Sequence, residues 1–138
     1  GCKIVHIGKN TTSTVHSKSI SKNGGAAFYR GLLKVMPEAT GTKATVECES
    51  LMLDNISSSD TIPIIDIRND SVDIGHEAKI GRISDEAIFY LMSRGISEDE
   101  AKAMIVRGFV EPISKELPLE YAVELNKLIE LELEGTIG

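Results

Sequence analysis

Cysteine is scarce in this sequence, which contains only Cys2 and Cys48 among its 138 residues. Two thiols are too few for a disulfide framework and too few for a metal site built from four thiolates. Free thiols are typical of a reducing compartment. We therefore expect both cysteines to be reduced and the protein to be cytoplasmic.

Long apolar runs are also missing. No stretch approaches the ~20 residues needed to cross a membrane. The first residues, GCKIVHIG, show no basic segment leading into a long apolar core, so no signal peptide is expected. These absences predict a protein that neither enters a membrane nor is exported.

Charge is divided unevenly along the chain. Residues 1–83 carry ten Lys and Arg against nine Asp and Glu, whereas residues 84–138 carry five against twelve, a net charge of −7. This acidity argues against nucleic acid and anionic membranes as partners. Acidic helix surfaces are common, and that is the plainer explanation. A basic patch on a protein partner is the alternative.

Residues 1–83 have the pattern of short strands separated by turns. β-branched residues are frequent, turn-forming residues recur between them, and no window shows a helical period. Strands are expected at residues 3–7, 12–16, 26–36, 42–53, 61–68 and 71–74. With no helical crossovers, these strands fit a β-solenoid or a sandwich.

The alternation of apolar and polar residues changes phase within residues 44–53. Val46 and Cys48 share one face, but Leu51 and Leu53 fall on the other. This change predicts a bulge or a corner. The first residues offer no cap for a solenoid end, so we expect the chain to be the C-terminal piece of a longer protein.

Helix signals begin after residue 83, so we divide the chain into a β region, 1–83, and a helical region, 84–138. Ser84 followed by acidic residues predicts an N-cap, and Gly95 is expected to end this first helix. Ser97 and Glu100 predict a capping box for a second helix, expected to end at Gly108.

A last helix is expected to start with Pro118 at its first position and to run to about Glu134. Its apolar arc is unusually wide. Such a helix packs on more than one neighbour, or on its own domain and a partner. Burial within the domain is the simpler expectation.

The stretch from Asp73 to Ile83, DIGHEAKIGRI, contains His76 beside Glu77. A zinc-protease motif is incomplete here, because Ile80 stands in place of the second histidine. Without a role in chemistry, the His76–Glu77 pair would be a hydrogen-bonded corner. We expect the other two histidines, His6 and His16, to be structural.

Cys48 has three possible roles. With His76 and a carboxylate it could form a Cys-His-acid hydrolase set, a minor alternative that requires the groups to converge in space. The same thiolate, imidazole and carboxylate suit iron or iron–sulfur chemistry, in a site completed by a second subunit. Otherwise Cys48 is a small buried apolar residue.

Five segments, in this order along the chain, resemble the SufB/SufD family of SUF iron–sulfur cluster assembly scaffolds. They are KIVHIGKNT at 3–11, FYRGL at 28–32, HEA at 76–78, SRGISE at 93–98 and ELPLEYA at 116–122. The thiol at Cys48 and the HEA segment favour the C-terminal portion of the SufB branch. A SufD-like structural partner without cluster ligands is the alternative.

The resemblance implies a fold and a function. The fold is mainly β with an α tail: the last rungs of a right-handed parallel β-helix, followed by a small C-terminal helical domain. The function is that of a non-catalytic scaffold, with a SufD-type subunit at the end of the β-helix and a SufC-type ABC ATPase docked on the helices. A homodimer of this chain is also expected.

The resemblance also implies the working residues. A transient iron–sulfur cluster would form between subunits of the full complex, and none is expected on the isolated chain. Cys48 and Glu77 correspond to the residues that matter for assembly and are the tentative metal ligands, with His76 as an auxiliary ligand. Some relatives carry an acidic residue where this sequence has Gly75, so any role of that acid is absent or supplied elsewhere.

Overall fold

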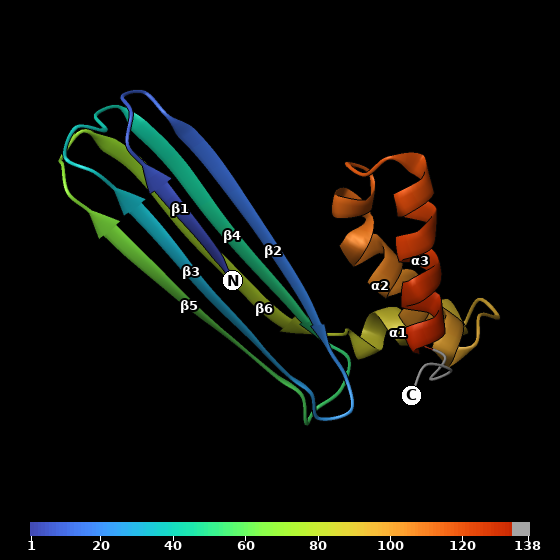
Figure 1. Ribbon diagram of the computed structural model, residues 1–138. Coiled ribbons are helices and arrows are strands. Elements are labelled where there is room, and N and C mark those ends of the chain that lie inside the picture. Colours follow the sequence, from blue (N-terminus) through green and yellow to red (C-terminus); the bar gives the residue numbers. More distant parts are fainter. Residues whose placement is uncertain (134–138) are drawn as a thin grey trace. The chain divides into compact units, whose positions relative to one another are not determined.

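The computed structural model of the chain describes residues 1–133 and divides it into two compact units, Gly1–Arg82 and Ile83–Gly138 (Figure 1). The first unit consists of strands and turns. The described part of the second unit consists of helices. The expectation of a mainly β protein with an α tail is confirmed.

Six strands form the first unit. They are β1 (Cys2–His6), β2 (Thr12–Ser21), β3 (Ala26–Val35), β4 (Thr42–Met52), β5 (Ser58–Ile67) and β6 (Val72–Arg82). Within the described residues, β1, β3 and β5 make one three-stranded sheet, here sheet A, and β2, β4 and β6 make another, sheet B. Successive strands therefore alternate between the two sheets.

Every strand pairing in these sheets is parallel. Each circuit of the chain returns to the same sheet after about thirty residues. For example, the side chains of Ser19 and Ser50 meet although they are 31 positions apart. This is the winding expected of a solenoid.

The strand containing His76 and Glu77 is longer than the sequence predicts. β6 pairs with β4 without interruption from Val72 to Arg82. The interpretation of His76 and Glu77 as a corner is therefore wrong, because both residues lie in the middle of a strand.

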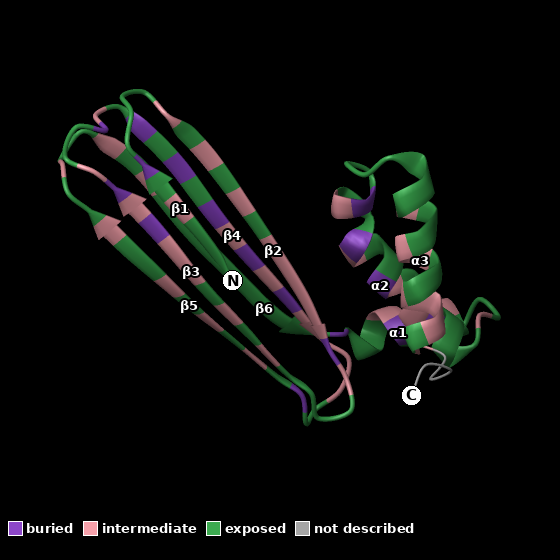
Figure 2. Ribbon diagram, viewed as in Figure 1, coloured by how far each residue is buried: buried purple, intermediate pink, exposed green. Residues whose placement is uncertain are grey.

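The predicted bulge in residues 44–53 is also wrong. β4 stays in register with both neighbours up to Met52, and buried and more exposed residues alternate along it (Figure 2). The phase changes because Ser50 occupies an inward position. Its Oγ accepts hydrogen bonds from Ser19, at 2.8 Å, and from Ser59, at 2.7 Å. A polar residue with satisfied hydrogen bonds can replace an apolar one in the interior.

The core of the first unit lies between the two sheets. Leu33 from sheet A packs with Ala44, Val46 and Cys48 from sheet B. At one end of this interior, the buried His6 ring makes hydrogen bonds to the hydroxyls of Thr11 and Ser13. His16 lies on the outside and is exposed. The structural role expected for His6 agrees with this arrangement.

Three helices form the described part of the second unit: α1 (Asp85–Met92), α2 (Glu98–Ser114) and α3 (Leu119–Leu133). The Ser84 side chain accepts a hydrogen bond from the backbone N–H of Ala87, and the Ser97 side chain accepts one from that of Glu100. Both predicted N-caps are confirmed. Residue 134, where the last helix was expected to end, lies outside the described residues.

The predicted end of the second helix at Gly108 is wrong, because α2 continues through Gly108 and Pro112 to Ser114. Val106 and Val110, on either side of the glycine, are both buried. Burial of these side chains outweighs the modest cost of a glycine within a helix.

The apolar arc of α3 is only partly buried within its unit. No residue of α3 is classed as buried among those described. Leu119 is 76% exposed and Val123 is 58% exposed. α3 does contact α2 within its own unit, where Arg107 of α2 pairs with Glu130 of α3. Packing within the domain, the simpler expectation, is therefore observed in part, and much of the apolar arc remains exposed.

Candidate functional site

Cys48 lies in the middle strand of sheet B and faces the interior between the sheets. Its side chain is 1% exposed. In the strand register its neighbours are Ser17 on β2 and Ala78 on β6. The sequence therefore correctly placed Cys48 on the same face as Val46.

The protonation of Cys48 follows from this position. Burial raises the pKa of its thiol above the ordinary value, and the nearby Cys2 raises it further. A low dielectric environment disfavours the charged thiolate. Cys48 is therefore held as a neutral thiol in the isolated chain, whereas metal ligation requires the thiolate.

Glu77 lies on the opposite face of sheet B from Cys48. It is adjacent in register to Glu47, whose carboxylate lies 3.1 Å from His16 Nδ1 on the outer surface. Lys79 Nζ lies 3.2 Å from Glu77 Oε1, and this contact raises the pKa of Lys79. The carboxylate expected to be an oxygen ligand thus already has a counter-ion from its own strand.

His76 lies on the same side of sheet B as Cys48. Its register partner is Val46, and the side chains of Val46 and Cys48 both face the interior. His76 is exposed because β6 is the last strand of the sheet. Within residues 1–133, no hydrogen bond joins His76 to Cys48, so the hydrolase alternative has no support from side-chain geometry.

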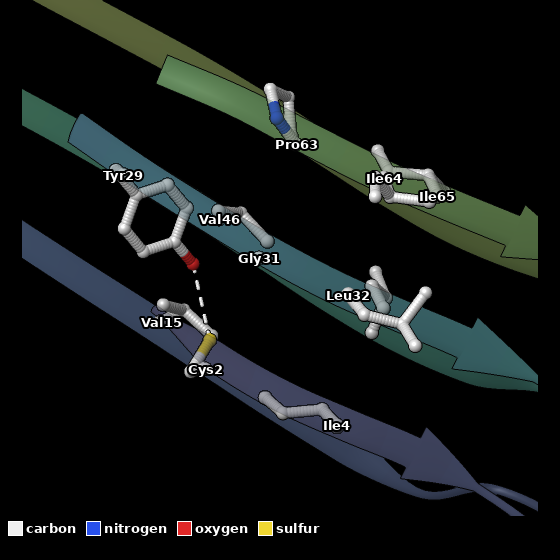
Figure 3. A pocket seen from close by; sticks show the side chains of 11 residues that line it. Cys2, Ile4, Val15, Tyr29, Gly31, Leu32, Val46, Pro63, Ile64 and Ile65 are labelled. Atoms are coloured by element: carbon white, nitrogen blue, oxygen red, sulfur yellow. Dashed lines mark hydrogen bonds between the residues drawn. The ribbon is translucent and has the colours of Figure 1, made fainter. Parts of the chain in front are cut away.

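A second thiol faces the same interior and was not singled out by the sequence. Cys2 Sγ lies 3.1 Å from the hydroxyl of Tyr29 (Figure 3). The Tyr29 ring lies over Gly31, where an added Cβ would meet the hydroxyl oxygen at 2.5 Å. Burial, and then the hydrogen bond to Cys2, raise the pKa of Tyr29. In the sequence, the one signal for this arrangement is that Tyr29 and Gly31 are two positions apart, which places both on the same face of a strand.

The Cys2–Tyr29 pair borders a hollow of the first unit. The empty volume is about 250 Å³, part of it open to solvent. Its other walls are apolar side chains from both sheets, including Ile4, Val15 and Val46. The hollow therefore lies beside the Cys48 strand without including Cys48 itself.

The predicted ligands do not form a complete metal site in one chain. Among residues 1–133, no group of three or more His, Cys, Asp or Glu side chains is placed to hold a metal ion. Cys48 and His76 share the inner face of sheet B, and Glu77 is on the outer face. An ion that binds ligands from both faces of the sheet can contact them only around an edge of the sheet.

The last strands of both sheets lie at the same end of the first unit, opposite the outer strands β1 and β2. β5 is the last strand of sheet A and β6 is the last strand of sheet B. Exposed isoleucines gather there: Ile62, Ile64, Ile65 and Ile67 on β5, and Ile80 on β6. Unpaired strand edges with apolar side chains are typical of surfaces that pair with another chain.

Parallel strands that alternate between two sheets, followed by helices, define the class of β-helix-like proteins with a C-terminal helical region. A family model described as "SUF system FeS cluster assembly, SufBD core domain" matches residues 1–109. The chain belongs to this SufBD family.

Curated relatives are similar over the whole chain. An iron-sulfur cluster assembly SufBD family protein of Staphylococcus haemolyticus is 56% identical over 138 residues. One of Mycobacterium leprae is 55% identical over the same length. The chain spans 30% and 16% of the length of these two relatives, respectively. The resemblance inferred from the sequence is thereby confirmed at the level of the family.

Nothing in the described helices suggests a membrane span: none within residues 1–133 is long and apolar enough to cross a bilayer.

Proposed function

We propose that this chain is the C-terminal part of a SufB-type scaffold on which an iron–sulfur cluster is built. The observation that carries the proposal is a buried thiol, Cys48, one strand from an open sheet edge in a member of the SufBD family. The strands would be the last rungs of a right-handed parallel β-helix. The protein would work in the cytoplasm and have no catalytic activity of its own.

A SufD-type subunit would cover the end formed by β5 and β6. The exposed isoleucines of these strands support a protein partner there. The backbone N–H and C=O groups on the free side of each strand offer further hydrogen bonds. In the absence of SufD, a second copy of this chain would occupy the same end as a homodimer.

The site residues would then act across the seam between chains. Cys48 would bind iron through its thiolate sulfur, and Glu77 would supply an oxygen ligand. His76 would be an auxiliary ligand on the same side as Cys48. The cluster is cargo, and an incomplete ligand set in one chain suits a scaffold that must release it.

Deprotonation of Cys48 is the step that the partner must favour. A cation brought close to the thiol stabilises the thiolate and opposes the effect of burial. Lys79 would compete with iron for the Glu77 carboxylate, because the ammonium lies against Glu77 Oε1.

A SufC-type ATPase would dock on the helical unit. The exposed apolar side chains of α1 and α3, which include Phe89, Leu119 and Val123, support a protein partner. The acidity of residues 84–138 favours a partner with a basic surface. Movement of the ATPase would act on cluster assembly through these helices.

A SufD-like structural subunit is the second candidate. The burial and raised pKa of Cys48 favour it, because an inert buried thiol needs no role in ligation. This candidate predicts that Cys48→Ser keeps full function as long as the heterodimer forms.

The test is maturation of an iron–sulfur enzyme by the whole protein in cells that also supply the SufC and SufD subunits. We expect Cys48→Ser and Glu77→Ala to reduce maturation to background. Cys2→Ser and Glu49→Ala are matched controls, since Glu49 is an outer-face carboxylate already paired with Lys18, and both should mature the enzyme normally. Normal maturation by the Cys48 and Glu77 variants would overturn the site assignment.

A further inference from the structure

Ala78 is the residue that lies between Cys48 and the open edge of sheet B. The register pairs Cys48 of β4 directly with Ala78 of β6. β6 has no neighbour beyond it in the described sheet. A reactant that arrives at this edge on the inner side therefore meets the side chain of Ala78 before it meets the thiol.

The inner-face positions of β6 near Cys48 differ in size. His76 pairs with Val46, Ala78 with Cys48, and Ile80 with Ser50. Imidazole and isoleucine side chains thus flank a single methyl group. The smallest side chain of the three lies at the level of the buried thiol.

Burial also differs between the two strands. Cys48 is 1% exposed, whereas Ile80 in the neighbouring strand is 47% exposed and Ala78 is also exposed. The thiol is thus one strand beneath the surface of the open end. A single inner-face methyl group on β6 lies at its level.

We propose that Ala78 controls the access of small reactants to the Cys48 thiol from this end of the first unit. The inference rests on the proposed role of Cys48 and names the residue that determines which reactants reach it. When the strands separate transiently, a molecule of the size of hydrogen sulfide passes beside the methyl group. Bulkier groups at this position close the route.

Added volume at Ala78 has a direct physical effect. Protein interiors are packed at the density of organic crystals, so two extra methyl groups next to the thiol must displace neighbours or fill the route. Removal of the methyl group has the opposite effect. The rate of chemical modification of Cys48 should therefore follow the size of the side chain at residue 78.

The experiment measures alkylation of Cys48 by iodoacetamide in the whole protein without partner subunits, with mass spectrometry of the peptide. Cys2 is a second free thiol, on β1 and away from the β6 edge, and serves as an internal reference in the same sample. For Ala78→Val we expect the rate at Cys48, relative to that at Cys2, to fall by about tenfold or more. For Ala78→Gly we expect this relative rate to rise several-fold.

Ser17→Val is the matched control, because Ser17 is the register neighbour of Cys48 on the other side, in β2. It replaces the hydroxyl with a methyl group and adds one more methyl next to the thiol, away from the β6 edge. The relative rate should change little in this variant. A loss as large as that of Ala78→Val would mean general tightening of the packing and would overturn the proposal.

Unchanged alkylation in the Ala78→Val variant would also overturn it. If that variant fails to fold, circular dichroism will show it, and Ala78→Gly alone decides: an unchanged rate at Cys48 contradicts the proposal. The outcome is independent of cluster assembly. If Cys48→Ser matures iron–sulfur enzymes normally while alkylation still follows residue 78, the proposed function fails and the access route remains.

Discussion

Cys48 and Glu77 lie on neighbouring strands but on opposite faces of sheet B. Glu77 is paired in register with Glu47, and Cys48 is paired with Ala78, the residue after Glu77. Because successive side chains of a strand point to opposite faces, the sheet itself separates the thiol from the carboxylate. One chain alone therefore does not bring the two groups to one face, and the proposed iron site requires contacts from a partner at the strand edge.

The serine cluster in the interior leads to a stability prediction. Ser50→Ala removes the acceptor that Ser19 and Ser59 share, and it leaves two hydroxyl groups in the interior with fewer partners. We expect a loss of about 1–3 kcal/mol in the free energy of unfolding, measured by chemical denaturation. Ser58→Ala, at an exposed position of the same strand as Ser59, should change stability by less than about 0.5 kcal/mol. An equal effect of both substitutions would contradict the role of the cluster.

Two glycines of the helical unit should respond in opposite ways to alanine. Gly108 is inside α2, and an added Cβ there has nothing within 4 Å. Gly108→Ala should therefore stabilise the protein by about 0.5–1 kcal/mol. Gly95 has a φ of +88°, which L residues rarely adopt, so Gly95→Ala should destabilise it by about 1 kcal/mol or more. Thermal unfolding of the two variants provides the test. A loss of stability in Gly108→Ala would contradict the claim that the glycine weakens α2.

The raised pKa of Cys48 makes stability depend on pH. In the unfolded chain a cysteine thiol ionises near pH ~8.5, whereas burial keeps Cys48 protonated to higher pH in the folded protein. The folded state thus binds more protons in this range, and its stability must fall as pH rises. The contribution of Cys48 is fully present below the unfolded pKa and is lost as pH passes through the folded pKa. Denaturation between pH 7 and pH 10 should show a steeper loss for the unmodified protein than for Cys48→Ala. Parallel curves would contradict the assignment.

Substitutions on α3 should separate stability from partner binding. Leu119→Glu and Val123→Glu alter side chains that are mostly exposed, so the free energy of unfolding should change by less than about 0.5 kcal/mol. Binding of the SufC-type ATPase should weaken about tenfold or more, as measured by calorimetry with the whole protein. Val106→Ala is the complementary control. Val106 is 1% exposed, and its truncation should cost about 2 kcal/mol of stability. Full ATPase binding by both α3 variants would place the docking surface elsewhere.

The local features of the fold were the ones that the sequence predicted well. Ser84 and Ser97 were recognised as helix caps because a cap depends on a few adjacent residues. The family was recognised from short segments in a fixed order. The end of α2 was not predicted correctly, because it is determined by the burial of Val106 and Val110. Burial depends on residues far along the chain.

Long-range pairing explains why the site could only be predicted in part. Residues that meet across strands, such as Lys18 and Glu49, are 31 positions apart, and no fixed sequence period marks them. The inward serine at position 50 also disguised the alternation of β4. Cys48 was therefore placed on the correct face, but the opposite orientation of Glu77 depends on the β4–β6 register. That register is visible only in three dimensions.

The central claim is that Cys48 binds the nascent cluster, and its most direct test is the iron and acid-labile sulfide carried by the purified complex. The whole protein, assembled with its SufC and SufD subunits, would be isolated without oxygen and analysed for both elements. The account predicts that Cys48→Ser abolishes both, whereas Cys2→Ser retains both. A Cys48→Ser complex that assembles normally and carries the full iron and sulfide would contradict it.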